Sequence, residues 1–102
     1  MDQQTILQTL KRLKPLYAKE GFIIEGLFGS YARNEADTHS DIDLLIHTEP
    51  SFTQKYGMTS IQRLNEIKAE LSDYFKVPVD LASSSGMSRT GKKFIIERTI
   101  YI

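Results

Sequence analysis

The chain has 102 residues, and its 13 Lys or Arg residues balance 13 Asp or Glu residues, so the formal net charge is zero and the pI is about 6.7. Proteins that bind duplex or bulk nucleic acid carry a surplus of basic residues, so this composition argues against that class. A length near 100 residues predicts a single domain, 1–102, because an independent core needs roughly 50 to 200 residues.

Cysteine is absent, which excludes disulfides, thiolate metal sites and cysteine nucleophiles. The first five residues are polar and acidic, whereas a secretory signal begins with basic and then apolar residues. No apolar stretch approaches the ~18 residues that a membrane span requires. We therefore expect a cytoplasmic protein.

The first part of the chain predicts a helix followed by a strand. Apolar residues recur at three- and four-residue steps over residues 2–19, with Asp2 as a possible N-cap. Pro15 lies inside this helix and predicts a kink or the start of a second turn there. The next run, Phe22–Phe28, is rich in β-formers and ends at Gly29-Ser30, where the chain can turn sharply.

The rest of the chain alternates between helical and strand patterns. In chain order we expect a helical turn at 31–33, a polar loop at 34–40, a strand over 41–47, a loop at 48–58, a helix over 61–71 capped by Thr59 or Ser60, a strand over 77–81, a connection at 83–86 and a helix over 91–99 before an apolar end. Pro78 places the third strand at an edge or a strand end. This order predicts an α/β (α+β) domain, in which helices cover a small mixed β-sheet.

The charges are segregated along the sequence. Every charged residue between Asn34 and Pro50 is acidic, namely Glu35, Asp37, Asp41, Asp43 and Glu49. On a strand, Asp41 and Asp43 point to the same face, with their Cα atoms roughly 7 Å apart. Carboxylates this close repel each other, and Mg²⁺ would relieve the repulsion. A bare Asp-x-Asp pair is more often a solvated surface pair, so this pair needs further support.

That support comes from Gly29 and Ser30, which lie between a predicted strand and a predicted helical turn. Glycine allows a ligand to approach the backbone, and free N–H groups at the start of a helix attract an anion. The Ser30 hydroxyl could bind the same phosphate. A Gly-Ser pair alone would be an ordinary turn, but a phosphate cradle followed by two carboxylates is what metal-assisted nucleotide chemistry needs.

Gly29-Ser30, ten further residues and Asp41-Ile42-Asp43 resemble the GS-x10-D-x-D signature of nucleotidyltransferases of the DNA polymerase β superfamily. The longer string GLFGSYARNEADTHSDIDLLI is similar to their minimal nucleotidyltransferase (MNT) branch. Asn34 departs from the glycine that many relatives have, and both residues tolerate a positive φ. The resemblance extends over most of the chain and implies the polymerase β-like fold.

The resemblance also implies roles for individual residues. Asp41 and Asp43 would bind two Mg²⁺ ions, and Gly29 and Ser30 would cradle the β and γ phosphates of a nucleoside triphosphate such as ATP. Asp80 matches the family's third carboxylate, which ligates the catalytic metal and helps to activate the acceptor hydroxyl. Taken alone, Asp80 would be a surface residue at a strand end.

Arg33 is a further candidate for nucleotide binding. It lies one turn after Ser30 and could reach a phosphate. A salt bridge to Glu35 or Asp37 is an equally good interpretation.

Two other signals are weak. Residues 86–92 fit G-x-x-x-x-G-K, but Lys93 follows where a P-loop needs Ser or Thr, so we reject a P-loop, although Lys92 or Lys93 could face a phosphate. His39 and His47 lack the tight cluster of His or Cys ligands that zinc requires, and we expect both at the surface.

The resemblance implies an antitoxin of the MntA type, which transfers AMP to a tyrosine of a HEPN-domain toxin encoded nearby. Two alternatives are a non-catalytic binding subunit and an enzyme that modifies a small molecule, such as an aminoglycoside, together with a helical subunit. Because the chain lacks a segment for the acceptor, we expect the acceptor or its binding subunit on another chain, in a homo- or hetero-oligomer. The acceptor, the preferred nucleotide and the oligomeric state stay open.

Overall fold

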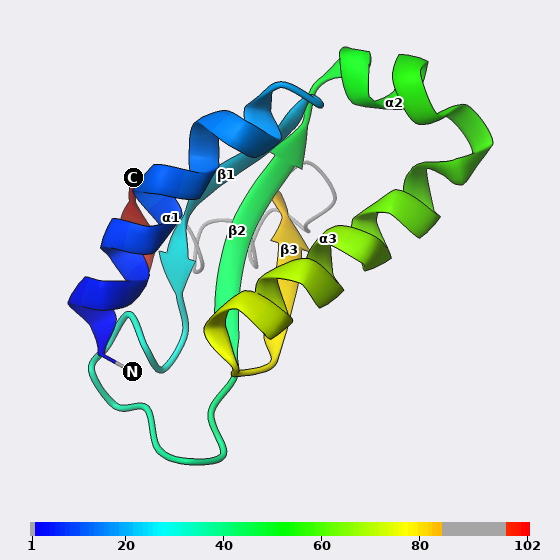
Figure 1. Ribbon diagram of the computed structural model, residues 1–102. Helices are drawn as coiled ribbons and strands as arrows, with labels where there is room; N and C mark the ends of the chain where they lie inside the picture. Colours follow the sequence, from blue (N-terminus) through cyan, green and yellow to red (C-terminus); the bar gives the residue numbers. More distant parts are fainter. Residues whose placement is uncertain (1, 85–97) are drawn as a thin grey trace.

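The computed structural model describes residues 2–84 and 98–102, coloured by sequence in Figure 1. Its elements are α1 (Gln3–Ala18), β1 (Phe22–Phe28), β2 (Ile42–Thr48), α2 (Pro50–Tyr56), the 3-10 helix η1 (Gly57–Thr59), α3 (Ser60–Phe75), β3 (Val79–Ser83) and β4 (Ile100–Tyr101). The strands form one sheet in the order β3-β2-β1-β4. The β2–β3 pair is parallel and the other two pairs are antiparallel, which confirms the predicted mixed sheet.

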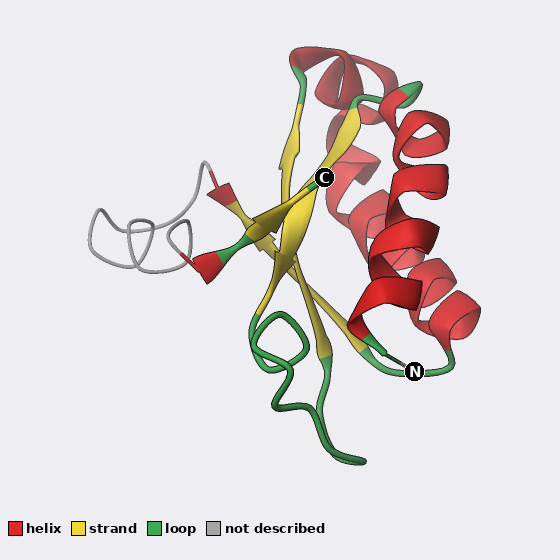
Figure 2. Ribbon diagram, turned by 90° about the vertical axis from the view of Figure 1, so that its left-hand side faces the viewer, coloured by secondary structure: helices red, strands yellow, loops and turns green. Residues whose placement is uncertain are grey.

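Helices α1, α2 and α3 lie on one face of this sheet, the helix face (Figure 2). The core fills the space between them and consists of apolar side chains that are almost fully buried. Its largest members with less than 2% exposure on this face are Ile6, Leu10, Phe22, Ile24, Leu27, Ile42, Leu44, Phe52, Ile67, Leu71 and Phe75. Burial of apolar area on the helix face is therefore the main force that holds the layers together. We call the opposite face of the sheet the far face.

The first helix begins and ends close to the predicted bounds. Asp2 is its N-cap, because its carboxylate accepts a hydrogen bond of 2.8 Å from the Thr5 N–H. Pro15 lies inside α1 without ending it, and the helix continues to Ala18. The apolar residues at helical spacing, Ile6, Leu10 and Leu13, face the core as predicted.

Strands β1 and β2 form the centre of the sheet. The prediction for Phe22–Phe28 is confirmed, and β2 runs from Ile42 to Thr48, one residue later than predicted. Ile42, Leu44 and Ile46 belong to the core. Because side chains alternate along a strand, Asp43 projects from the far face.

The segment 48–58 is not the loop that the sequence suggested. Pro50 occupies the first turn of α2, where its missing N–H would have no helical partner in any case, and Phe52 is buried with 1% exposure. The interpretation of Pro50 and Gly57 as loop residues was therefore wrong. Helix α3 starts after Thr59, as predicted, but the Thr59 hydroxyl donates to the Tyr56 carbonyl and caps no helical N–H.

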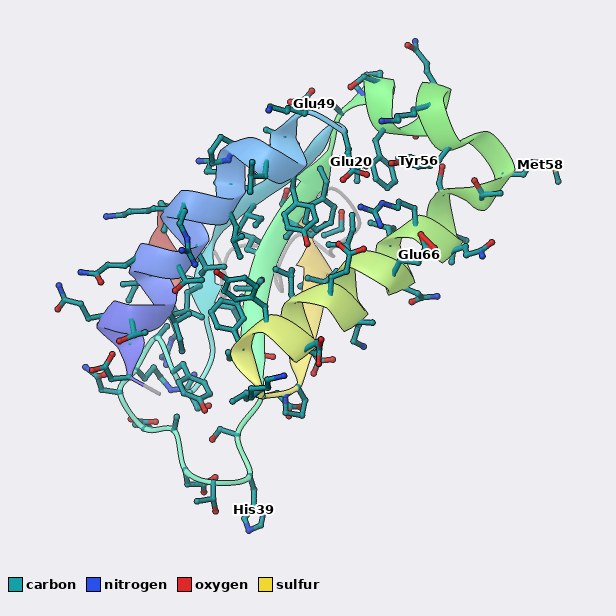
Figure 3. All side chains as sticks on the ribbon, viewed as in Figure 1. Glu20, His39, Glu49, Tyr56, Met58 and Glu66 are labelled. Atoms are coloured by element: carbon teal, nitrogen blue, oxygen red, sulfur yellow. The ribbon has the colours of Figure 1, made fainter. Side chains whose placement is uncertain are left out.

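An ion-pair network fastens α2 and α3 to the end of α1. The Arg63 guanidinium donates two hydrogen bonds to Glu20, from Nε at 2.7 Å and Nη2 at 2.8 Å, and one of 2.8 Å to Glu70. The Tyr56 hydroxyl also donates to Glu20, and Figure 3 shows these two side chains facing each other. At the protruding corner beyond them, Met58 is fully exposed.

The last two strands occupy the sheet edges. Strand β3 starts at Val79 rather than residue 77 and pairs only with β2 among the described strands, which confirms the predicted edge position. The apolar C-terminal end forms β4, antiparallel to β1, which the sequence did not indicate. Of the helix predicted over 91–99, residues 91–97 lie outside the described residues. No described helix has the length and apolar character needed to cross a membrane.

Candidate active site

The site begins at the turn that follows β1. The helical turn predicted at 31–33 is present as a single turn, in which the Arg33 N–H donates to Gly29 O at 3.2 Å, but it does not continue into a helix: residues 30–34 form successive turns, and the Glu35 N–H donates to Ser30 O at 2.9 Å. The second bond spans five residues, which is wider than the α-helical repeat. The N–H groups of Ser30, Tyr31 and Ala32 have no acceptor among the described residues. Successive free N–H groups of this kind form a binding site for an anion.

Gly29 allows this turn to lie directly against Asp43. Its φ is +78°, and a Cβ at this position would overlap Asp43 Oδ2 and lie 3.0 Å from Asp43 Cγ. The register explains the contact, since Phe28 pairs with Asp43 across the β1–β2 ladder. The positive φ and the approach of the carboxylate therefore both favour glycine at this position.

The parallel β2–β3 pair brings Asp80 to the same place. Asp43 and Asp80 are register partners, and Val79 and Leu81 on either side of Asp80 pack on the core. Asp80 therefore projects from the far face, as predicted, on the strand beside Asp43. Asp41 lies immediately before β2 rather than inside it.

The other two carboxylates influence Asp43. Burial raises the pKa of Asp43 above its ordinary value, and the negative charges of Asp80 and Asp41 raise it further. The positive charge of Arg33 acts in the opposite direction on the pKa of Asp43. The turn and two strands thus bring together a negatively charged cluster of Asp41, Asp43 and Asp80, which we call the carboxylate cluster.

Lys68 of α3 reaches the edge of this cluster. Its ammonium lies 3.3 Å from Asp80 Oδ1, and both side chains are about half exposed. Within residues 2–84 and 98–102, no three acidic or histidine side chains converge closely enough to hold a metal ion. The oxygen donors nevertheless fit Mg²⁺, which takes only one or two protein carboxylates and completes its shell with water and phosphate. Asp41 and Asp43, with Asp80 on the adjacent strand, are the residues that would hold it.

Arg33 forms the salt bridge to Glu35 that the sequence allowed, and its role in phosphate binding stays a prediction. Its Nε lies 3.0 Å from Glu35 Oε2, in an ion pair whose side chains are 41% and 65% exposed. Exposed pairs of this kind stabilise a fold by about 0 to 1 kcal/mol, so Glu35 holds Arg33 only weakly. Arg33 also lies close enough to Asp43 to affect its pKa.

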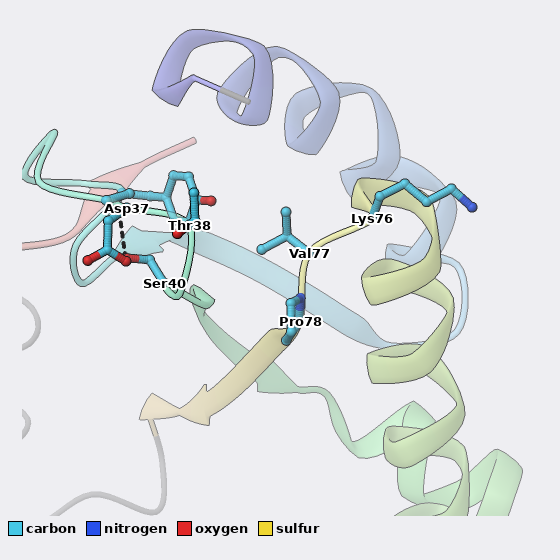
Figure 4. Close-up of a pocket in the computed structure, with 8 residues that line it drawn as sticks. Asp37, Thr38, Ser40, Lys76, Val77 and Pro78 are labelled. Atoms are coloured by element: carbon cyan, nitrogen blue, oxygen red, sulfur yellow. Dashed lines mark hydrogen bonds between the residues drawn. The ribbon is translucent and has the colours of Figure 1, made fainter.

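A cavity of about 480 Å³ lies near the residues that precede β2 and β3. Figure 4 shows it between the loop 36–40 and the segment 76–78, with the Lys76 ammonium directed away from Asp37, Thr38 and Ser40. Ser40 precedes Asp41, and Pro78 accepts a hydrogen bond of 2.9 Å from the Ile42 N–H. The cavity therefore offers a concave surface next to the start of β2.

The histidines lie apart from this cluster. His39 is exposed at the tip of the 36–40 loop, far from the sheet in Figure 3. His47 lies between Glu25 and Glu49, with Nδ1 3.0 Å from Glu25 and Nε2 3.5 Å from Glu49. The residues of the rejected P-loop pattern, 86–92 with Lys93, lie outside the described residues.

The fold and the candidate site agree with a family assignment from comparison with known proteins. The family model for the nucleotidyltransferase domain matches residues 6–102. The chain therefore belongs to the nucleotidyltransferase domain family and is a nucleotidyltransferase.

Individual relatives place it near protein adenylyltransferases. It is 39% identical over 93 residues to "Putative protein adenylyltransferase MJ0126" of Methanocaldococcus jannaschii, covering 90% of this chain and 85% of the relative. It is 29% identical over 77 residues to "Protein adenylyltransferase MntA" of Thermococcus cleftensis, covering 76% of this chain and 71% of that protein. The resemblance to the MntA type is thus confirmed at the level of sequence.

Two solved structures share the fold. "Structure of putative minimal nucleotidyltransferase" matches with a TM-score of 0.76 and 29% identity, covering 100% of this chain and 97% of the other. "Crystal structure of the toxin-antitoxin with AMP-PNP" matches with a TM-score of 0.64 and 20% identity, covering 99% of this chain and 72% of the other. The first match confirms the minimal nucleotidyltransferase fold.

Proposed function

We propose that this chain transfers AMP from ATP to a hydroxyl on a partner protein, namely a tyrosine of a HEPN-domain toxin for which it is the antitoxin. The observation that carries the proposal is the position of Asp43, between the Gly29 turn and Asp80. Asp43 lies against the anion-binding turn and is also the neighbour of Asp80 on the adjacent strand. Relatives named as protein adenylyltransferases, and a fold neighbour described as a toxin-antitoxin, support the choice of a protein acceptor.

The residues divide into two groups by chemistry. The free N–H groups of the 29–32 turn and the Ser30 hydroxyl would bind the β and γ phosphates, with Arg33 as an additional positive charge. Asp41, Asp43 and Asp80 would hold two Mg²⁺ ions, which would neutralise charge on the attacking and leaving oxygens.

The transfer itself is a substitution at phosphorus. The acceptor oxygen forms a bond to the α-phosphorus, the bond from that phosphorus to the bridging oxygen of the β-phosphate breaks, and pyrophosphate leaves. Asp80 is more than half exposed, so it is accessible to an incoming hydroxyl and is suited to accept its proton directly or through water.

The test is to incubate the chain with Mg²⁺, α-labelled ATP and a HEPN-domain partner. We expect label on the partner, and we expect Asp43→Asn to lose at least 100-fold of the transfer rate while the thermal unfolding midpoint stays the same or rises. Asp73→Asn is the matched control, because Asp73 is 86% exposed and pairs only with Lys76 among the described residues.

The alternatives predict different results. Label on a small hydroxyl compound such as an aminoglycoside, and not on the partner, would replace the protein acceptor by a small molecule. If Asp43→Asn neutralised the partner as effectively as the wild-type chain does, and no label appeared on the partner, the chain would be a non-catalytic binding subunit.

A further inference from the structure

The turn that follows β1 is tied to the start of α1 by one side chain. Gln3 Nε2 donates hydrogen bonds to the carbonyl oxygens of Tyr31 at 3.2 Å and Ala32 at 2.8 Å, across 28 and 29 residues of sequence. Both N–H bonds of the Gln3 amide are used in this way. Among the described residues, these are the only side-chain hydrogen bonds that join residues 30–32 to another element.

These two bonds fix the orientation of two peptide groups. In a trans peptide the N–H points opposite to the C=O of the same plane. Because Gln3 holds the Tyr31 carbonyl, the Ala32 N–H points away from α1, and because it holds the Ala32 carbonyl, so does the Arg33 N–H. The Arg33 N–H donates to Gly29, whereas the Ala32 N–H has no acceptor within the described residues.

Gln3 belongs to a helix that packs on the core. Gln3 lies in the first turn of α1, directly after the N-cap Asp2. One turn further, Ile6 has no exposed surface. A change in the direction of the 31–32 peptides would therefore have to break hydrogen bonds to an anchored helix.

We infer that Gln3 is a positioning residue that fixes the direction of the Ala32 N–H and thereby keeps the 30–32 turn ready for the triphosphate. This role rests on the proposed function. Gln3 would then affect nucleotide binding from the start of the chain without itself contacting the substrate.

The experiment compares Gln3→Ala and Gln3→Glu with Gln4→Ala. Gln4 is the adjacent residue of the same helix and is exposed, so its substitution controls for any change in helix propensity. Gln3→Glu keeps the size of the side chain but places acceptor oxygens against two carbonyls. The readouts are KM and kcat for ATP in the transfer assay, and hydrogen exchange of the backbone amides of residues 30–35.

We expect Gln3→Ala to raise KM for ATP about fivefold to 20-fold, since each lost hydrogen bond is worth roughly a factor of five, with a smaller effect on kcat. Gln3→Glu should raise KM further. Both should accelerate exchange at Arg33 and Glu35, while Gln4→Ala leaves both readouts unchanged. A KM and an exchange rate in Gln3→Ala equal to those of Gln4→Ala would overturn the inference.

The two proposals fail separately. A wild-type chain that transfers no AMP would contradict the proposed function, and the exchange measurement would still test whether Gln3 holds the turn. If Gln3→Ala lowers the unfolding midpoint, both readouts are taken well below that midpoint, where a loss of stability alone leaves KM unchanged.

Discussion

The Lys68 ammonium on α3 lies 3.3 Å from the Asp80 carboxylate on β3. The lysine belongs to the helix face and the aspartate to the far face, and they meet because β3 is the edge strand of the sheet. A cation that binds the carboxylate cluster through Asp80 would have to compete with this ammonium.

Replacing Lys68 by Gln should therefore strengthen the binding of a divalent cation. Exposed ion pairs are worth up to about 1 kcal/mol, so we expect a gain in Mn²⁺ affinity of at most about fivefold at low ionic strength. The gain should shrink in high salt, because added ions screen the removed charge. Calorimetric titration with Mn²⁺ measures both effects.

The control for this experiment is Lys76→Gln. Lys76 pairs with Asp73 at 3.5 Å, and its side chain is 80% exposed. The Lys76→Gln substitution removes the same charge and leaves the contact between Lys68 and Asp80 in place. Equal Mn²⁺ affinities in the two variants would contradict a role of Asp80 in holding the cation.

Replacing Gly29 by Ala should disrupt the site more than the fold. A residue other than glycine at a positive φ costs roughly 1 to 2 kcal/mol, and the new Cβ would displace the Asp43 carboxylate. We expect a lower unfolding midpoint and a transfer rate reduced at least tenfold under conditions where the variant is fully folded.

Gly57→Ala separates these two effects. Gly57 also has a positive φ, +54°, but a Cβ there would have no heavy atom within 4 Å. This variant should lose stability and keep its transfer rate. If Gly29→Ala also kept its rate, the close approach of Asp43 to the turn would be irrelevant to activity.

The Arg63 network should make stability depend on pH in the acid range. Hydrogen bonds from Arg63, helped by Tyr56, lower the pKa of Glu20 from 4.5 to about 2. Between these values the unfolded chain binds more protons than the folded one, so this contribution is present above pH 4.5 and is lost as the pH falls towards 2. Its size is at most about 3 kcal/mol, since the Glu20 side chain is only 17% exposed.

Urea unfolding at a series of pH values tests this dependence. Glu20→Gln should flatten the slope of the unfolding free energy between pH 4.5 and 2. Glu66→Gln should leave most of the slope intact, because Glu66 is 52% exposed and lies 3.5 Å from Arg63. Equal slopes in wild type and Glu20→Gln would exclude Glu20 as the source.

Phe52→Ala should be strongly destabilising, although the sequence pattern places this residue in a loop. Its ring is 1% exposed and packs near Phe22 and Tyr56, with ring centroids 6.4 and 5.0 Å away. Truncating a buried Phe costs about 3 to 5 kcal/mol. Met58→Ala, at a fully exposed position, should change the unfolding free energy by less than about 0.5 kcal/mol, as measured by urea unfolding.

The sequence predicted the central part of the fold well because its signals are local. The β-rich run Phe22–Phe28 and the alternation after Asp41 both specify a strand with one apolar face. The same alternation placed Asp43 and Asp80 on the polar side of their strands. The spacing from Gly29 to Asp43 is also contained in a short stretch of sequence, and the family resemblance depends mainly on it.

Other features depend on contacts that no local pattern encodes. Pro50 favours a loop or the first turn of a helix equally, and only the burial of Phe52 decides between them. Lys68 and Gln3 are ordinary polar residues of amphipathic helices in the sequence. Their contacts with Asp80 and with the turn carbonyls arise only from the way α3 and α1 pack on the sheet.

The parallel pairing of β2 with β3 should also affect the order in which the site assembles. Asp43 and the Gly29 turn come together when two neighbouring strands pair, across a short span of sequence. Asp80 is separated from β2 in the sequence by α2, η1 and α3. Because contacts between distant residues form slowly, we expect Asp80 to join the site later. A chain that has formed only the β1–β2 hairpin would hold the phosphate-binding turn without the third carboxylate, so competence for transfer should follow the docking of the edge strand.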